Sequence, residues 1–200
     1  MPTIQSYRAS RSSRFLQNKF MTKQELISTL NLKPLEIEGG LFSEVYRAKL
    51  KLNSDDFPPA FKSETYNAST SIYFMLGADD ISKMHSVASD ETWHFYCASE
   101  SGVYISLLVI SPNGEGKIIR LGADILAGQR PQFTVPAGYM MGAYIARDGV
   151  DSAYLKRNDA WVLMGATVAP SFEYVDFVRG DALEIAKQCP AFASEILKIG

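Results

Sequence analysis

The sequence contains few of the residues that build disulfide frameworks, metal sites or nucleic-acid-binding surfaces. It has only two cysteines and two histidines in 200 residues. Cys97 and Cys189 lie far apart and cannot form a disulfide framework or, by themselves, a zinc site, which fits a reducing compartment. The 20 Lys and Arg residues are balanced by 22 Asp and Glu residues, without a long basic run. We therefore expect no nucleic-acid partner.

Long apolar segments are also missing from the sequence. No stretch approaches the roughly 18 apolar residues that cross a bilayer. The first 20 residues lack the apolar core of a secretory signal. We therefore expect a cytoplasmic protein without a membrane partner.

Residues 1–20 differ in composition from the rest of the chain. They contain four basic residues, several serines and no acidic residue. Organelle-import peptides have this composition, and so do flexible tails. We interpret residues 1–20 as a flexible N-terminal extension, with organelle import as the alternative. Residues 21–200 are long enough to bury one core and are interpreted as a single domain.

Helix signals stand at both ends of this domain, and strand signals lie between them. Thr22 and Glu25 have the spacing of a capping box and predict a short helix that ends before Pro34. Asp181 begins a second helical segment, and Pro190 separates it from a third. The intervening runs of β-branched and aromatic residues are separated by turns and predict a β-sandwich or barrel. These runs are 44–49, 61–66, 71–76, 91–97, 103–110, 117–121, 132–135, 140–146, 161–168 and 173–178.

Six short motifs follow one another in a characteristic order. They are Glu38–Arg47, Ser69–Leu76, His85 with Ser89–Tyr96, Leu121–Gly122, Gly128–Gly138, and Thr167–Pro170 with Phe172 and Phe177. In this order they resemble the Cupin_5 family of uncharacterised cupin-like proteins, within the RmlC-like cupin superfamily. The resemblance implies an all-β fold, a cupin double-stranded β-helix (jelly-roll) barrel with a short N-terminal helix and C-terminal helices. It also implies a small-molecule cavity inside the barrel.

The metal-binding motif of this superfamily is incomplete here. His85 and Glu91 fit two ligand positions, but Val87 and Met141 stand where further histidines are expected. Met140 also replaces an expected Trp. The resemblance therefore implies either no cofactor or one divalent transition metal, held by His85, Glu91 and His94 together with water.

Both histidines lie close to a pair of acidic residues. A histidine oriented by a carboxylate can act as a general base. Some metal-free sugar epimerases of the superfamily combine such a pair with a tyrosine acid. We predict that the catalytic residues are His85, Glu91, His94 and Tyr73, with Tyr96, Tyr104, Tyr139 and Tyr144 as other candidate acids. The predicted ligand contacts are Trp93, Tyr96, Gln132 and Met140.

Strand alternation limits how these residues combine. In a regular strand Glu91 and Trp93 face one side, and His94 and Tyr96 face the other. Unless a β-bulge near Asp90–Trp93 realigns the strand, only one of Glu91 and His94 accompanies His85. The sequence leaves that choice open.

Three hypotheses on function follow. The first is epimerase- or isomerase-like chemistry on a carbohydrate-type substrate through a His–carboxylate pair. The second is a non-catalytic cupin that binds a sugar or another small molecule. The third is a metal-dependent enzyme with an incomplete ligand set. Exposed sheet edges also lead us to expect a homodimer.

Overall fold

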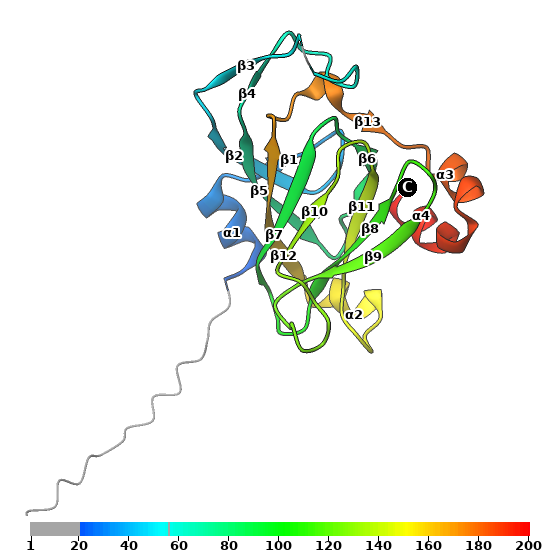
Figure 1. Ribbon diagram of the computed structural model, residues 1–200. Helices are drawn as coiled ribbons and strands as arrows, with labels where there is room; N and C mark the ends of the chain where they lie inside the picture. Colours follow the sequence, from blue (N-terminus) through cyan, green and yellow to red (C-terminus); the bar gives the residue numbers. More distant parts are fainter. Residues whose placement is uncertain (1–20, 56) are drawn as a thin grey trace, which may run out of the picture.

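The computed structural model describes residues 21–55 and 57–200. The interpretation of residues 1–20 therefore lies outside the described residues. Two antiparallel β-sheets pack face to face, with helices on their outer faces (Figure 1). This arrangement confirms the predicted all-β fold with a short N-terminal helix and C-terminal helices.

The larger sheet has six strands and carries most of the site described below. Its strands, in spatial order, are β1 (Lys33–Pro34), β2 (Leu41–Arg47), β5 (Thr70–Gly77), β12 (Trp161–Ala169), β7 (Asp90–Ala98) and β10 (Gln132–Val135). The second sheet contains β13 (Val178–Arg179), β6 (Ser82–Ser86), β11 (Met140–Ala146), β8 (Tyr104–Ile110) and β9 (Gly116–Leu121). A separate hairpin pairs β3 (Lys51–Asn53) with β4 (Thr65–Asn67).

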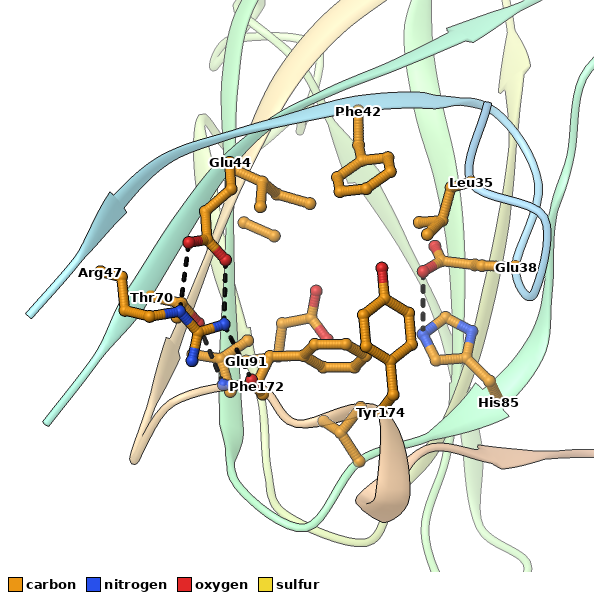
Figure 2. A pocket seen from close by; sticks show the side chains of 14 residues that line it. Leu35, Glu38, Phe42, Glu44, Arg47, Thr70, His85, Glu91, Phe172 and Tyr174 are labelled. Atoms are coloured by element: carbon orange, nitrogen blue, oxygen red, sulfur yellow. Dashed lines mark hydrogen bonds and ion pairs between the residues drawn. The ribbon is translucent and has the colours of Figure 1, made fainter. Parts of the chain in front are cut away.

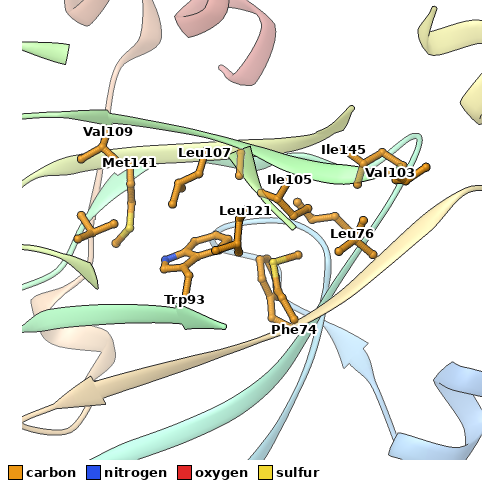
Figure 3. Close-up of a cluster of buried hydrophobic side chains, with 14 of the residues drawn as sticks. Phe74, Leu76, Trp93, Val103, Ile105, Leu107, Val109, Leu121, Met141 and Ile145 are labelled. Atoms are coloured by element: carbon orange, nitrogen blue, oxygen red, sulfur yellow. The ribbon is translucent and has the colours of Figure 1, made fainter. Parts of the chain in front are cut away.

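The main core lies between the two sheets. Alternation along β5 and β7 points Phe74 and Trp93 inward, where their rings meet edge to face with centroids 5.8 Å apart. Figure 3 shows these rings beside Leu121 and the inward side chains of β8 and β11. The core fills one end of the barrel and leaves a cavity toward the other.

Helices cover the outer faces of both sheets. Helix α1 (Lys23–Leu30) begins at Thr22, whose predicted capping box with Glu25 is formed, and it ends at Asn31 in a left-handed conformation. It packs on the outer face of the larger sheet. Helices α3 (Ala182–Gln188) and α4 (Ala193–Ile199), joined by η2 (Pro190–Phe192), pack on the second sheet. No helix among the described residues combines the length and apolar character needed to cross a membrane.

The structure differs from the predicted elements at several places, among them the short strands β1 and β3, which were not predicted, and β2, which spans Leu41–Arg47 instead of 44–49. Strand β6 was missed because Ser82–Ser86 has no β-branched residue and no Phe, Tyr or Trp, and pairing with β11 and β13 imposes its conformation. Helix α2 (Ser152–Arg157), capped by Asp151, was also missed. Residues 61–66 contribute only the start of β4, because strand pairing begins at residue 65. Residues 173–178 form the short helix η1 (Tyr174–Asp176) followed by β13.

Candidate functional site

A cavity lies between the inner face of the larger sheet and strand β6 (Figure 2). Strands β2, β5, β12 and β7 form one wall, and Phe172, which precedes η1, and Tyr174, the first residue of η1, cover the cavity. Its volume open to the centres of water molecules is about 70 Å³, which is room for on the order of five waters. The polar lining residues are Glu38, Glu44, Arg47, Thr70, His85 and Glu91.

A register shift in β2 determines which of its side chains face the cavity. Glu44 pairs with Ile72, but the next paired residue is Tyr46, so Val45 is an extra residue in the strand. The shift puts Arg47, rather than Tyr46, on the same side as Glu44. Both side chains therefore line the cavity, while Tyr46 is 55% exposed on the outside.

His85 reaches the cavity from β6 with a fixed ring orientation. Its Nδ1 donates a hydrogen bond to the Lys83 carbonyl oxygen at 2.7 Å, because a carbonyl oxygen can only accept. The ring stacks on Phe177 with centroids 5.1 Å apart and planes 15° apart. These contacts leave Nε2 directed to the cavity side, 3.8 Å from a Glu38 carboxylate oxygen. In the neutral imidazole this nitrogen carries the lone pair and can accept a proton.

Glu38 is held by a tight turn and by strand β6. Its carbonyl oxygen accepts a hydrogen bond from the Lys83 amide at 2.9 Å. One carboxylate oxygen accepts from the Ser82 hydroxyl at 2.5 Å, and the other faces His85. The turn continues through Gly39 and Gly40, which both have positive φ. Glu38 and His85 therefore form a His–carboxylate pair from two separate segments.

Glu91 is a buried acidic side chain in the lining of the cavity. It is 7% exposed, and its carboxyl group makes no hydrogen bond within the described part of the chain. Burial, and then the negative charge of Glu38, raises the pKa of Glu91 to about 8. Figure 2 shows the carboxyl group pointing into the cavity. The raised pKa favours the protonated form of Glu91 at neutral pH.

Arg47 lies at the other end of the cavity and is bound by acidic residues. Across the sheet Arg47 pairs with Thr70, Thr70 with Val168, and Val168 with Glu91. Three strand spacings of about 4.8 Å each therefore separate the backbones of Arg47 and Glu91. The guanidinium instead bonds Glu44 at 2.9 and 3.1 Å and Glu173 at 2.7 Å.

The cavity residues do not fit a metal centre. Among the described residues, no group of three or more His, Cys, Asp and Glu side chains is placed to hold a metal ion. Val87, at the position of an expected histidine, lines the cavity with an apolar side chain. Met141, at another such position, is buried in the core. We therefore derive no step through a metal.

The structure separates the site residues that the sequence grouped together. His85 and Glu91 line the cavity, whereas Trp93 is fully buried in the core. The sequence left open whether a β-bulge lets His94 face the cavity together with Glu91. The pairing of β7 with β12 is regular from Asp90 to Phe95, so the two side chains lie on opposite faces of the sheet. The register shift lies beyond Phe95, so no bulge turns His94 inward.

The remaining predicted residues also lie away from the cavity. On the outer face of the larger sheet, His94 bonds the Thr167 hydroxyl at 3.1 Å and stacks on Tyr96. Tyr73 contacts Tyr96 there, and Gln132 pairs with His94. Met140 packs under the C-terminal helices. These residues lie away from the cavity because side chains alternate between the two faces of a strand. Ile72, next to Tyr73, and Met141, next to Met140, point inward, and so does Glu91 on the strand that carries His94.

Sequence reasoning missed Glu38, Phe42, Glu44 and Arg47 as site residues. All four belong to the motif Glu38–Arg47 that carries part of the family resemblance. The alternation of Phe42 and Glu44 was a usable signal for a common face. Gly39 and Gly40 indicate a turn after Glu38 but not the direction of its side chain, and the register shift that directs Arg47 left no signal in the sequence.

Comparison with known proteins identifies the family. The family Cupin_5, described as "Cupin superfamily (DUF985)", matches residues 24–179, and the chain belongs to it. A hypothetical protein from Leishmania major is 28% identical, with a TM-score of 0.73, over 90% of this chain and 98% of that one. A protein from Shewanella oneidensis is 28% identical, with a TM-score of 0.69, over 90% and 97% of the two chains. The search of curated proteins found no match.

Proposed function

We propose that the cavity binds a small carbonyl-containing, carbohydrate-type molecule and catalyses an isomerase- or epimerase-like proton transfer on it. The observation that carries the proposal is that one buried cavity contains Glu91, a carboxyl group whose pKa is raised by burial, and a His–carboxylate pair, His85 with Glu38. Titratable groups that hold opposite protonation states in one site are suited to acid–base catalysis.

Each group has a defined part in the proposed reaction. His85 Nε2 accepts a proton from the carbon next to the substrate carbonyl, and the nearby Glu38 carboxylate stabilises the imidazolium that forms. Glu91 donates a hydrogen bond or its proton to the carbonyl oxygen, which stabilises the enol. Return of a proton to carbon completes the exchange. Apolar walls and burial limit water access, which strengthens these interactions.

Proton transfer to carbon can be measured without knowing the product. In D₂O, the protein is expected to exchange the hydrogen next to the carbonyl in at least one of a panel of three- to six-carbon aldoses and ketoses, followed by proton NMR. His85→Gln and Glu91→Gln should each slow this exchange by about 100-fold or more, since general acid–base groups contribute on that scale. His94→Gln, on the opposite face of the sheet, is the matched control and should keep the rate.

Other outcomes discriminate clearly. Loss of exchange in His94→Gln but not in His85→Gln would place the chemistry outside the cavity. Exchange no faster than in buffer for the whole panel would contradict proton transfer. The second hypothesis, a binding protein without catalysis, would then gain support from a small molecule retained in native mass spectrometry and lost in Glu91→Gln. The absence of any hydrogen bond to Glu91 among described residues favours a ligand partner in either case.

A further inference from the structure

We infer that the ligand of this cavity carries a positively charged nitrogen, as in a small amine, which lies between carboxyl groups and aromatic rings. The inference rests on the proposal that the cavity binds a small molecule. It does not require that proton transfer follows. Three observations support it: the saturation of Arg47, the excess of carboxyl groups, and the aromatic walls.

Arg47 has no hydrogen-bond donor left for an anionic ligand. A guanidinium has five N–H groups. Nε and Nη2 donate to Glu44, Nη1 donates to Glu173 and to Asn67 Oδ1 at 3.3 Å, and Nη2 also donates to the Phe172 carbonyl at 3.4 Å. Five contacts thus occupy the five N–H groups. Arg47 is also the only Lys or Arg residue in the described lining of the cavity.

Acidic side chains dominate the remaining polar lining. Glu38, Glu44 and Glu91 line the cavity, and Glu173 stands beside it on Arg47. One guanidinium faces the two carboxylates Glu44 and Glu173, so that end keeps an excess negative charge. At the other end Glu91 is more than nine-tenths buried, points into the cavity and accepts no hydrogen bond from the described residues. In the described lining, carboxyl groups are therefore present in excess over cationic groups that are free to bind a ligand.

The aromatic rings in the apolar part of the lining also favour the binding of a cation. Phe42 lies on one side of the cavity and Phe172 and Tyr174 on the other, as Figure 2 shows. The rings of Phe172 and Tyr174 meet edge to face, with centroids 5.2 Å apart. Aromatic faces attract ammonium groups, and the attraction reaches about 2 kcal/mol or more in desolvated sites. An ammonium group would therefore find both hydrogen-bond acceptors and aromatic rings.

A cation would also change the proton balance of the site. The charged and titratable groups that line the cavity with Glu91 are Glu38 from the turn, His85 from β6, Glu44 and Arg47 from β2, and Tyr174 from η1. Burial and Glu38 keep a proton on Glu91, whose pKa is about 8. An ammonium group near both carboxyls compensates the charge of Glu38 and favours ionised Glu91. Amine binding at pH 7 should consequently release a proton.

Three probes of nearly equal size separate the effect of charge from that of shape. Ethanolamine is cationic at pH 7, ethylene glycol is neutral, and glycolate is anionic. Titrations of the whole protein, followed by NMR and calorimetry, are expected to give about tenfold or tighter binding of ethanolamine than of ethylene glycol, with glycolate weakest. Calorimetry in two buffers of different ionisation enthalpy should show proton release on ethanolamine binding.

Two variants test the carboxyl and aromatic parts separately. Glu91→Gln should weaken ethanolamine binding by about tenfold and abolish proton release, while leaving ethylene glycol binding unchanged. Phe172→Leu, which keeps an apolar side chain but removes the ring, should weaken ethanolamine binding several-fold. Glu115→Gln, at an exposed turn, is the control and should change neither.

The results distinguish this inference from the proposed catalysis. Equal or tighter binding of ethylene glycol or glycolate, or no binding of ethanolamine at high millimolar concentration, would overturn the amine inference even if carbon-bound hydrogen exchanges in sugars. Ethanolamine binding without exchange would support the inference and contradict proton transfer.

Discussion

Replacing Glu91 with Gln is expected to stabilise the protein at alkaline pH and to leave its stability nearly unchanged at pH 4. The pKa of Glu91 is about 8 in the folded protein, against an ordinary value of 4.5. Below pH 4.5 the carboxyl group is protonated in both states. Between these two values the unfolded chain ionises while the folded protein keeps its proton, so folded stability falls by about 1.4 kcal/mol per pH unit. Above pH 8 the loss is complete.

Gln has the shape of the protonated acid but does not titrate, so the variant avoids this loss. At pH 9 the expected gain is several kcal/mol, or a rise in Tm of about 10 °C for a chain of this length. Thermal unfolding of both proteins from pH 4 to pH 9 measures the difference in their stability. The contributions of the other titrating groups largely cancel in this difference, because both proteins contain them. Glu115→Gln, on an exposed turn, should give a flat difference. A flat difference for Glu91→Gln would mean that Glu91 is ionised without cost in the folded protein.

The same side chain shows how far the sequence could predict the site. His85 and Glu91 were predicted from their place in the cupin motif, and both line the cavity. The choice between Glu91 and His94 depends on which face of β7 is turned inward. Alternation separates the two residues but does not say which face is inner. Only the packing of Trp93 into the core decides it, because Trp93 shares a face with Glu91.

The fold was easier to predict than the site for a physical reason. The strand pattern repeats from residue 44 to residue 178, so errors such as the missed β6 did not change the predicted sheet architecture. The site depends on single events instead. A one-residue register shift turns Arg47 toward Glu44, and a turn with positive φ brings Glu38 to His85. Neither event has a periodic signal in the sequence.

Of these local features, the turn at Gly39 should have the largest effect on stability when it is disturbed by a substitution. Gly39 has a φ of 111°, and a Cβ at this position would overlap with the carbonyl oxygen of Ile81. Gly39→Ala therefore combines an unfavourable backbone conformation with a collision against backbone, which cannot move aside as a side chain end can. We expect a loss of about 3 kcal/mol or more, or a fall in Tm of about 6–12 °C.

A matched glycine separates the collision from the backbone conformation. Gly149 also has a positive φ, of 69°, but no atom lies within 4 Å of the point that a Cβ would occupy there. Gly149→Ala should therefore cost only about 1–2 kcal/mol. Because Gly39 follows Glu38, the folded fraction of Gly39→Ala should also bind ethanolamine more weakly, while Gly149→Ala should bind it normally. Equal losses of stability in the two variants would show that the turn yields to the added methyl group, and the Glu38–His85 pair would then depend less on this turn than on the Ser82 hydrogen bond.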